Sequence, residues 1–85
     1  MKNFDELKLS KDLISFPSIA PVDAGAIKYI SKKLKKLGFI CNILEFRDKK
    51  NPTIKNLYAR FGNKKPNLCY AGHTDVVPPG NINDW

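Results

Sequence analysis

The chain has 85 residues, of which 42% are hydrophobic and 27% charged, and its formal net charge is +7 at pH 7. This apolar content excludes a disordered chain, and the length allows one small domain or a piece of a larger one. No run approaches the ~18 apolar residues of a membrane span, and the first residues do not resemble a signal peptide, so we expect a cytoplasmic location and no membrane partner. Cys41 and Cys69 form neither a disulfide framework nor a metal-type pair.

The positive charge leaves a basic binding module open as an alternative function. The chain has 13 lysines but only two arginines, Arg47 and Arg60, and arginine is the usual reader of base edges. The lysines are scattered, and no aromatic or zinc-finger pattern typical of nucleic-acid binding accompanies them. Lysine, asparagine and isoleucine share A- and T-rich codons, so a biased base composition accounts for the charge more simply. A nucleic-acid partner is therefore not expected.

The first half of the chain predicts two helices joined by a loop. Apolar residues spaced along residues 4–15 indicate the first helix, which should end before Pro17 because a residue preceding proline disfavours the α conformation. Asp23 is a good N-cap for the second helix. Four apolar residues then share one helix face, with lysines opposite: Ile27, Ile30, Leu34 and Leu37. Gly38 follows where a left-handed C-cap is expected.

The second half of the chain predicts strands. Three segments rich in β-forming residues are separated by the polar stretches 47–55 and 62–67 and followed by the irregular residues 78–85: 39–46, 56–61 and 68–72. The order helix, helix, strand, strand, strand predicts an α/β fold in which the helices cover the sheet.

The only histidine, His73, stands just past the third predicted strand, where α/β proteins commonly place ligand-binding groups. Residues two apart in an extended backbone face the same way about 6.6 Å apart, so His73 and Asp75 can meet side by side. This is the geometry of a metal-bound histidine whose second ring nitrogen is held by a carboxylate. It is equally the geometry of a surface ion pair, or of an aspartate turn that orders a loop.

A hydrolytic site needs more groups than this pair. A zinc site uses three or four protein ligands, and Cys69 is about 13 Å from His73 by strand rise, too far to share an ion. The remaining carboxylates show no spacing that suggests convergence, and no serine or cysteine joins the histidine in a nucleophile motif. By this reasoning the chain lacks the parts for hydrolysis.

The stretch AGHTDVVPPG at 71–80, followed five residues later by Trp85, resembles the first metal-ligand motif of the M20-type zinc aminoacylase and peptidase family. The resemblance extends to PSIAPVDAG at 17–25 and to NLYARFG at 56–62, and it covers essentially the whole chain. The residues of the motif resemble most the members of this family that act on N-succinyl-diaminopimelate, rather than those that act on acetylornithine or peptides. Ala20 is a departure, because the family more often has threonine or asparagine before this proline.

The resemblance implies that residues 1–85 are the N-terminal fragment of a three-layer, zinc-peptidase-like catalytic domain, without the lid and dimerisation domain. It implies that His73 is a metal ligand and that Asp75 serves catalysis by orienting the imidazole. The family binds two zinc or cobalt ions per site and works as a homodimer. Its reaction, part of lysine and cell-wall biosynthesis, is hydrolysis of N-succinyl-diaminopimelate to succinate and diaminopimelate.

The family's other metal ligands and its general base follow the region that this chain covers. The resemblance therefore implies a metallohydrolase fragment that is inactive alone. A complementing C-terminal chain that supplies the missing ligands and a non-functional remnant of a decaying gene are both left open. The third strand and the strand 39–46 would have open edges, which predicts a poorly soluble or partly molten chain.

Overall fold

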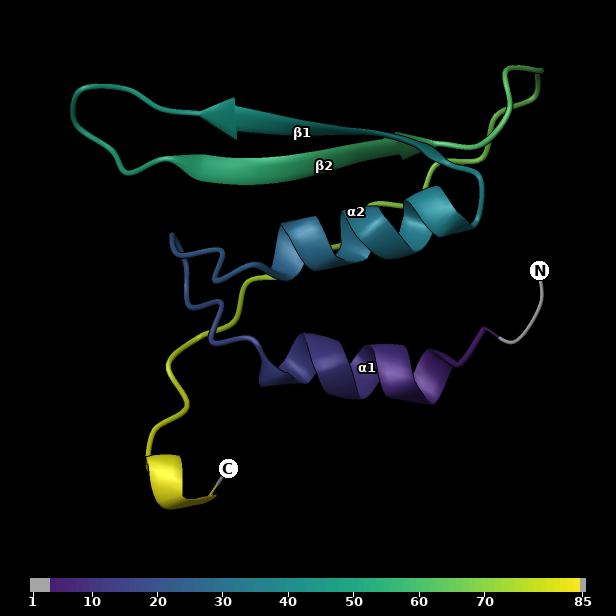
Figure 1. Ribbon diagram of the computed structural model, residues 1–85. Coiled ribbons are helices and arrows are strands. Elements are labelled where there is room, and N and C mark those ends of the chain that lie inside the picture. The colour runs from purple at the N-terminus through teal and green to yellow at the C-terminus, as the bar shows by residue number, and fades with distance from the viewer. Residues whose placement is uncertain (1–3, 85) are drawn as a thin grey trace.

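The computed structural model describes residues 4–84 (Figure 1). Its elements follow in the order α1 (Glu6–Ser15), α2 (Ala26–Lys36), β1 (Ile40–Phe46), β2 (Ile54–Arg60) and the 3₁₀ helix η1 (Ile82–Asp84). The predicted order of two helices and then strands is confirmed for the first four of these elements, and the fold class is α/β. Trp85 of the motif lies outside the described residues.

Two aspartates start the two helices. The Asp5 carboxylate accepts the backbone N–H of Lys8 at 2.9 Å, so α1 begins two residues later than predicted. Gly25 occupies the N-cap position of α2, but the carboxylate of Asp23 accepts the first-turn N–H of Ile27 at 3.1 Å. The capping role predicted for Asp23 is therefore confirmed, although the residue stands two positions before the cap itself.

The helices also end as predicted. The chain leaves α1 two residues before Pro17, with an extended residue between them. After α2, Gly38 adopts a φ of +97°, and its N–H donates to the carbonyl of Lys35. The N–H of Phe39 donates to the carbonyl of Leu34 at 3.1 Å. These paired bonds make a Schellman cap, which uses the left-handed conformation that glycine adopts without strain.

β1 and β2 form a two-stranded antiparallel sheet. Its register runs from Ile40 opposite Arg60 to Phe46 opposite Ile54. β1 matches the predicted strand within one residue, whereas β2 begins two residues earlier than predicted. The ladder extends to Ile54 because Phe46 provides a partner for it, and it stops short of Pro52, which has no N–H to donate.

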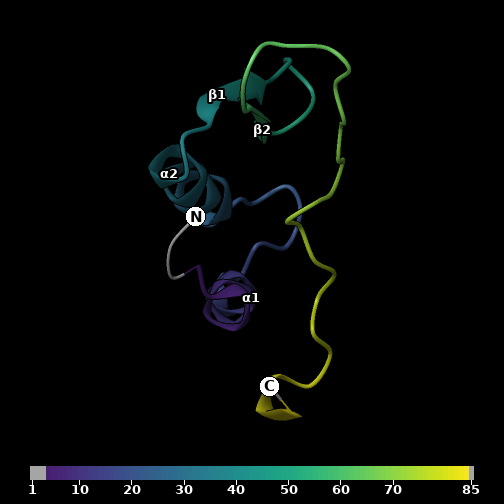
Figure 2. The same cartoon turned by 90° about the vertical axis from the view of Figure 1, so that its right-hand side faces the viewer.

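The prediction of a third strand at 68–72 is wrong. This segment pairs with no other strand in residues 4–84, and Leu68 and Tyr70 are 97% and 92% exposed. Figure 2 shows it running down one side of the molecule, apart from the sheet. A strand needs a neighbour for its backbone N–H and C=O groups, and β-forming side chains record only the propensity for such pairing.

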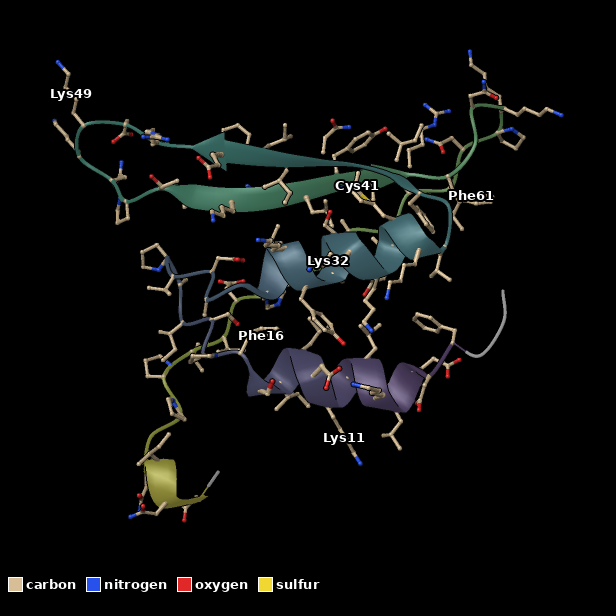
Figure 3. All side chains as sticks on the ribbon, in the orientation of Figure 1. Lys11, Phe16, Lys32, Cys41, Lys49 and Phe61 are labelled. Carbon is tan, nitrogen blue, oxygen red and sulfur yellow. The ribbon has the colours of Figure 1, made fainter. Side chains whose placement is uncertain are left out.

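Both helices lie on the same side of the sheet, with α2 between the sheet and α1 (Figures 1 and 2). The rings of Phe39 and Phe61 pack with their centroids 5.4 Å apart, where the sheet meets the end of α2. Cys41 lies between β1 and α2 (Figure 3), and its Sγ is 3.7 Å from the carbonyl oxygen of Ser31. The prediction that helices cover the sheet is thus confirmed for α2, whereas α1 lies beyond α2 and away from the strands.

The described residues bury little apolar surface. Among residues 4–84, Ala26 and Ile27 are the only buried apolar residues, whereas fifteen large apolar residues are exposed. The accessible surface is 7639 Å², against about 5,100 Å² for a compact monomer of 9.6 kDa. The radius of gyration is 14.9 Å, against about 12 Å for a compact domain of this length. The chain therefore exposes apolar surface that a compact domain would cover.

Candidate functional site

The turn that carries His73 is anchored to the loop between α1 and α2. The N–H of Val76 donates to the carbonyl of Ser18 at 2.9 Å, and Val76 forms an isolated parallel β-bridge with Ile19. The Oγ of Ser18 donates to the carbonyl of Thr74 at 2.7 Å. These bonds hold the backbone on both sides of Asp75, although segment 68–72 before the histidine is unpaired.

His73 and Asp75 meet as their spacing predicts. The Nδ1 of His73 lies 2.9 Å from Oδ1 of Asp75 and 3.0 Å from the carbonyl oxygen of the same residue. Both partners are acceptors, so Nδ1 must carry the proton that it donates. In the neutral ring this leaves the lone pair on Nε2, which is the atom that a histidine held by a carboxylate offers to a metal ion.

This pair is open to solvent. The side chains of His73 and Asp75 are 83% and 55% exposed. An ion pair at that exposure contributes little to stability, so the fold gains little from it. The accessible Nε2 agrees with a ligand role, but the same geometry serves a surface pair, and the choice between these interpretations depends on what else can reach the histidine.

The site faces a cleft of about 540 Å³. Its lining includes residues 54–57 of β2, the pair His73 and Asp75, and the apolar side chains of Ile27 and Ile30. Asp23 is also on the lining, but its carboxylate is bonded to backbone N–H groups at the start of α2. The cleft is thus mainly a gap between the free edge of the sheet and the unpaired segment.

The described residues do not complete a metal site. Within residues 4–84 no group of three or more histidine, cysteine, aspartate or glutamate side chains could hold one ion. Cys69 is exposed on the unpaired segment. The pair fits one ligand and its orienting carboxylate, short of the three or four ligands of a zinc site.

No pattern in the sequence singles out Ser18. It is 1% exposed and bonds through both its hydroxyl and its carbonyl to the turn at the site. Its partner Thr74 is 56 residues away, so no local spacing could connect the two. The only local signal is a polar residue between Pro17 and an isoleucine in a loop otherwise expected to face water.

A second polar cluster joins α1 to α2. The Nζ of Lys8 is 2.7 Å from Oδ2 of Asp12, and the hydroxyl of Tyr29 donates a hydrogen bond to the same oxygen. The hydrogen bond from Lys8, followed by that from Tyr29, lowers the pKa of Asp12, and the bond to Asp12 raises the pKa of Tyr29. Tyr29 also packs on Phe16, with ring centroids 5.3 Å apart. This cluster has a structural role in attaching α1.

No helix in residues 4–84 is long and apolar enough to cross a membrane.

No protein-family model matches the chain. Individual relatives do match it. The chain is 59% identical, over all of its 85 residues, to the succinyl-diaminopimelate desuccinylase of Pelagibacter ubique, and 58% identical over 81 residues to that of Wolbachia pipientis wMel. A relative of the same name from Rhodospirillum centenum is 48% identical over 81 residues. The chain spans 22%, 19% and 21% of these proteins, or about a fifth of their length.

Proposed function

From the chain's relationship, over its whole length, to the succinyl-diaminopimelate desuccinylases, we propose that it supplies one part of the metal-binding site of a hydrolase of this kind. The observation that carries the proposal is the hydrogen bond from Nδ1 of His73 to the Asp75 carboxylate, which leaves Nε2 free. His73 is the metal ligand in this proposal, and Asp75 orients its ring. The substrate is N-succinyl-diaminopimelate, which the enzyme would cleave to succinate and diaminopimelate.

Each residue has a distinct task. When bound, zinc or cobalt polarises a carbonyl and makes water nucleophilic at neutral pH. His73 offers Nε2 to the ion, and Asp75 accepts the Nδ1 proton, which fixes the tautomer and raises the basicity of the ligand. Neither residue takes the proton of the attacking water in this proposal. That proton requires a general base from outside the described residues.

The 85 residues do not hydrolyse the substrate by themselves in this proposal. One imidazole is a weak site, since catalytic zinc needs three protein ligands. Further polypeptide, either in the same protein or in a complementing chain, supplies the remaining ligands and the base. The surface area above that of a compact monomer supports this view, because a docked partner would cover the exposed apolar residues. The three-layer catalytic domain, two metal ions, the homodimer and a cytoplasmic location belong to the same proposal.

Complementation tests it. The 85-residue chain is co-expressed with the part of the Pelagibacter ubique relative that the chain does not match, and the purified mixture is assayed for amide hydrolysis of N-succinyl-diaminopimelate and for bound zinc. We expect both signals in the mixture and neither from either part alone. His73→Gln should lower activity and zinc content at least tenfold, and Asp75→Asn by roughly 10- to 100-fold.

Lys49→Gln is the matched control, because Lys49 lies in the exposed loop between the two strands (Figure 3) and is not among the residues that line the cleft. It should leave activity and zinc content unchanged. Hydrolysis by the 85 residues alone would contradict the proposal, as would full activity of the His73→Gln mixture. A mixture that assembles but binds no zinc would favour the remnant interpretation.

A further inference from the structure

Ser18 is the largest fully buried side chain in the described residues, at 1% exposed. We propose that it is a positioning residue for His73: its hydroxyl and carbonyl fix the backbone turn that points His73 and Asp75 at each other. The inference rests on the proposed function in so far as it concerns a metal ligand. Ser18 lies outside the pair, and its bonds to this turn are made to backbone groups.

The two bonds of Ser18 bracket Asp75. Its Oγ donates to the carbonyl of Thr74, the residue before, and its carbonyl accepts the N–H of Val76, the residue after. A backbone fixed at both positions in a parallel β-bridge is extended there, and in an extended backbone the side chains of residues two apart share one face. The clamp therefore sets which face Asp75 presents to His73.

The hydroxyl of Ser18 replaces a backbone donor. In a regular parallel ladder the N–H of Ser18 would donate to the Thr74 carbonyl, but this N–H is bonded to the carbonyl of Phe16 at 2.8 Å. The Oγ of Ser18 takes its place at 2.7 Å. The Thr74 carbonyl needs a donor at this partly buried position, and the Ser18 hydroxyl supplies it.

The exposed pair cannot hold itself in place. Side chains that are 83% and 55% exposed compete with water for every hydrogen bond. The bond from the Oγ of Ser18 is partly buried and therefore less open to competition from water, so the order of the pair derives from the clamp. Without the hydroxyl the turn loses its anchor at Thr74, and Asp75 stops holding the Nδ1 proton of His73. The Nε2 lone pair then becomes less basic and less able to bind a metal ion.

The reactivity of the single histidine measures this directly. The 85-residue chain at low micromolar concentration is treated with diethyl pyrocarbonate at about pH 8.5, where an ordinary histidine is neutral, and modification of His73 is followed by peptide mass spectrometry. We expect Ser18→Ala to slow the reaction several-fold, to the rate of Asp75→Asn. Ser31→Ala, the same change at the other buried serine, on α2, should keep the wild-type rate.

The double variant separates positioning from a general loss of structure. Ser18→Ala combined with Asp75→Asn should react no more slowly than either single variant, because both remove the same contact. A wild-type rate in Ser18→Ala, or a double variant whose slowing is the product of the two single effects, would overturn the proposal. An unchanged rate in Asp75→Asn would overturn it as well, because the aspartate would then not hold the ring.

Two further variants of similar shape keep the test decisive if Ser18→Ala unfolds and loses its helical circular dichroism signal. Ser18→Thr and Ser18→Val introduce a similar steric load and differ in the hydroxyl. The proposal expects the threonine variant to react faster than the valine variant, and equal rates would overturn it. Because no metal or substrate is present, a failure here leaves the proposed hydrolase function intact. Failure of the complementation assay likewise leaves this result standing.

Discussion

Phe61 closes over Gly38: a β-carbon built on the glycine would lie 3.1 Å from Cε2 of the phenylalanine ring. The same ring packs on Phe39, the residue after the glycine. Gly38, which caps α2, and Phe39, which leads into β1, therefore both contact Phe61, the residue after β2. This joint holds the sheet on the helix where the described residues bury little else.

Gly38→Ala should destabilise this joint. An L-residue at a φ of +97° costs about 1–2 kcal/mol, and displacement of the Phe61 ring adds to that cost. We expect a lower urea midpoint in circular dichroism. Gly62→Ala is the control, since Gly62 has a φ of +77° but no atom within 4 Å of the added carbon. Equal losses in the two variants would show that the Phe61 contact has no energetic weight.

The Asp23 cap should account for part of the stability of α2. Asp23→Ala removes the acceptor for the N–H of Ile27, at a cost of about 0.5–2 kcal/mol in the free energy of unfolding. Asp23→Asn keeps an oxygen in the same place and should lose much less. Far-UV circular dichroism during urea unfolding measures both variants. If alanine and asparagine behave alike, the cap interpretation is wrong.

Stability should depend on pH through the cluster at Asp12. The pKa of Asp12 is lowered by Lys8 and then by Tyr29, so its contribution is complete above the ordinary carboxyl value of about 3.9 and is lost as pH falls through the lower folded value. The pKa of Tyr29 is raised. Its contribution is therefore present below about pH 10 and is lost at higher pH.

Thermal unfolding measured across the pH range tests these signs. Tyr29→Phe should reduce the alkaline loss, of which a part remains because the hydrogen bond to Asp12 also raises the pKa of Lys8. The same variant should bring the acid loss closer to the ordinary carboxyl value, while the Lys8 contact keeps some lowering of the pKa of Asp12. Asp12→Asn should remove both dependences, and an alkaline loss of wild-type size in Tyr29→Phe would contradict the role of Tyr29.

The exposed apolar surface should make the 85-residue chain associate. Leu68 and Tyr70 are almost fully exposed on an unpaired, extended segment, which offers both apolar side chains and free backbone groups. We expect concentration-dependent oligomers in sedimentation velocity between micromolar and millimolar concentrations. Replacing both residues with lysine should reduce association more than the control, in which two exposed apolar residues of α1, Leu7 and Ile14, are replaced with lysine. A monomer with a sharp two-state unfolding transition would contradict this expectation.

Local chemistry was readable from the sequence where the partners of a residue are close in the chain. Asp23 bonds to an N–H four residues on, and Gly38 ends α2 because the left-handed conformation is a property of that residue. The contact of His73 with Asp75 also follows from a spacing of two in an extended backbone. In each case the interaction lies within a few residues, so a pattern of residue types contains it.

Features that depend on partners far apart in the chain are visible only in the folded molecule. Residues 68–72 have the composition of a strand but remain unpaired, because no described segment lies beside them to accept their hydrogen bonds. Ser18 anchors the site from 56 residues away, and no spacing in the sequence indicates this. The helices, their caps and the histidine–aspartate pair follow from residue types and spacings that are local in the chain. Only the fold decided which backbone groups are satisfied and what holds that pair, because hydrogen bonding between distant segments depends on their packing in space.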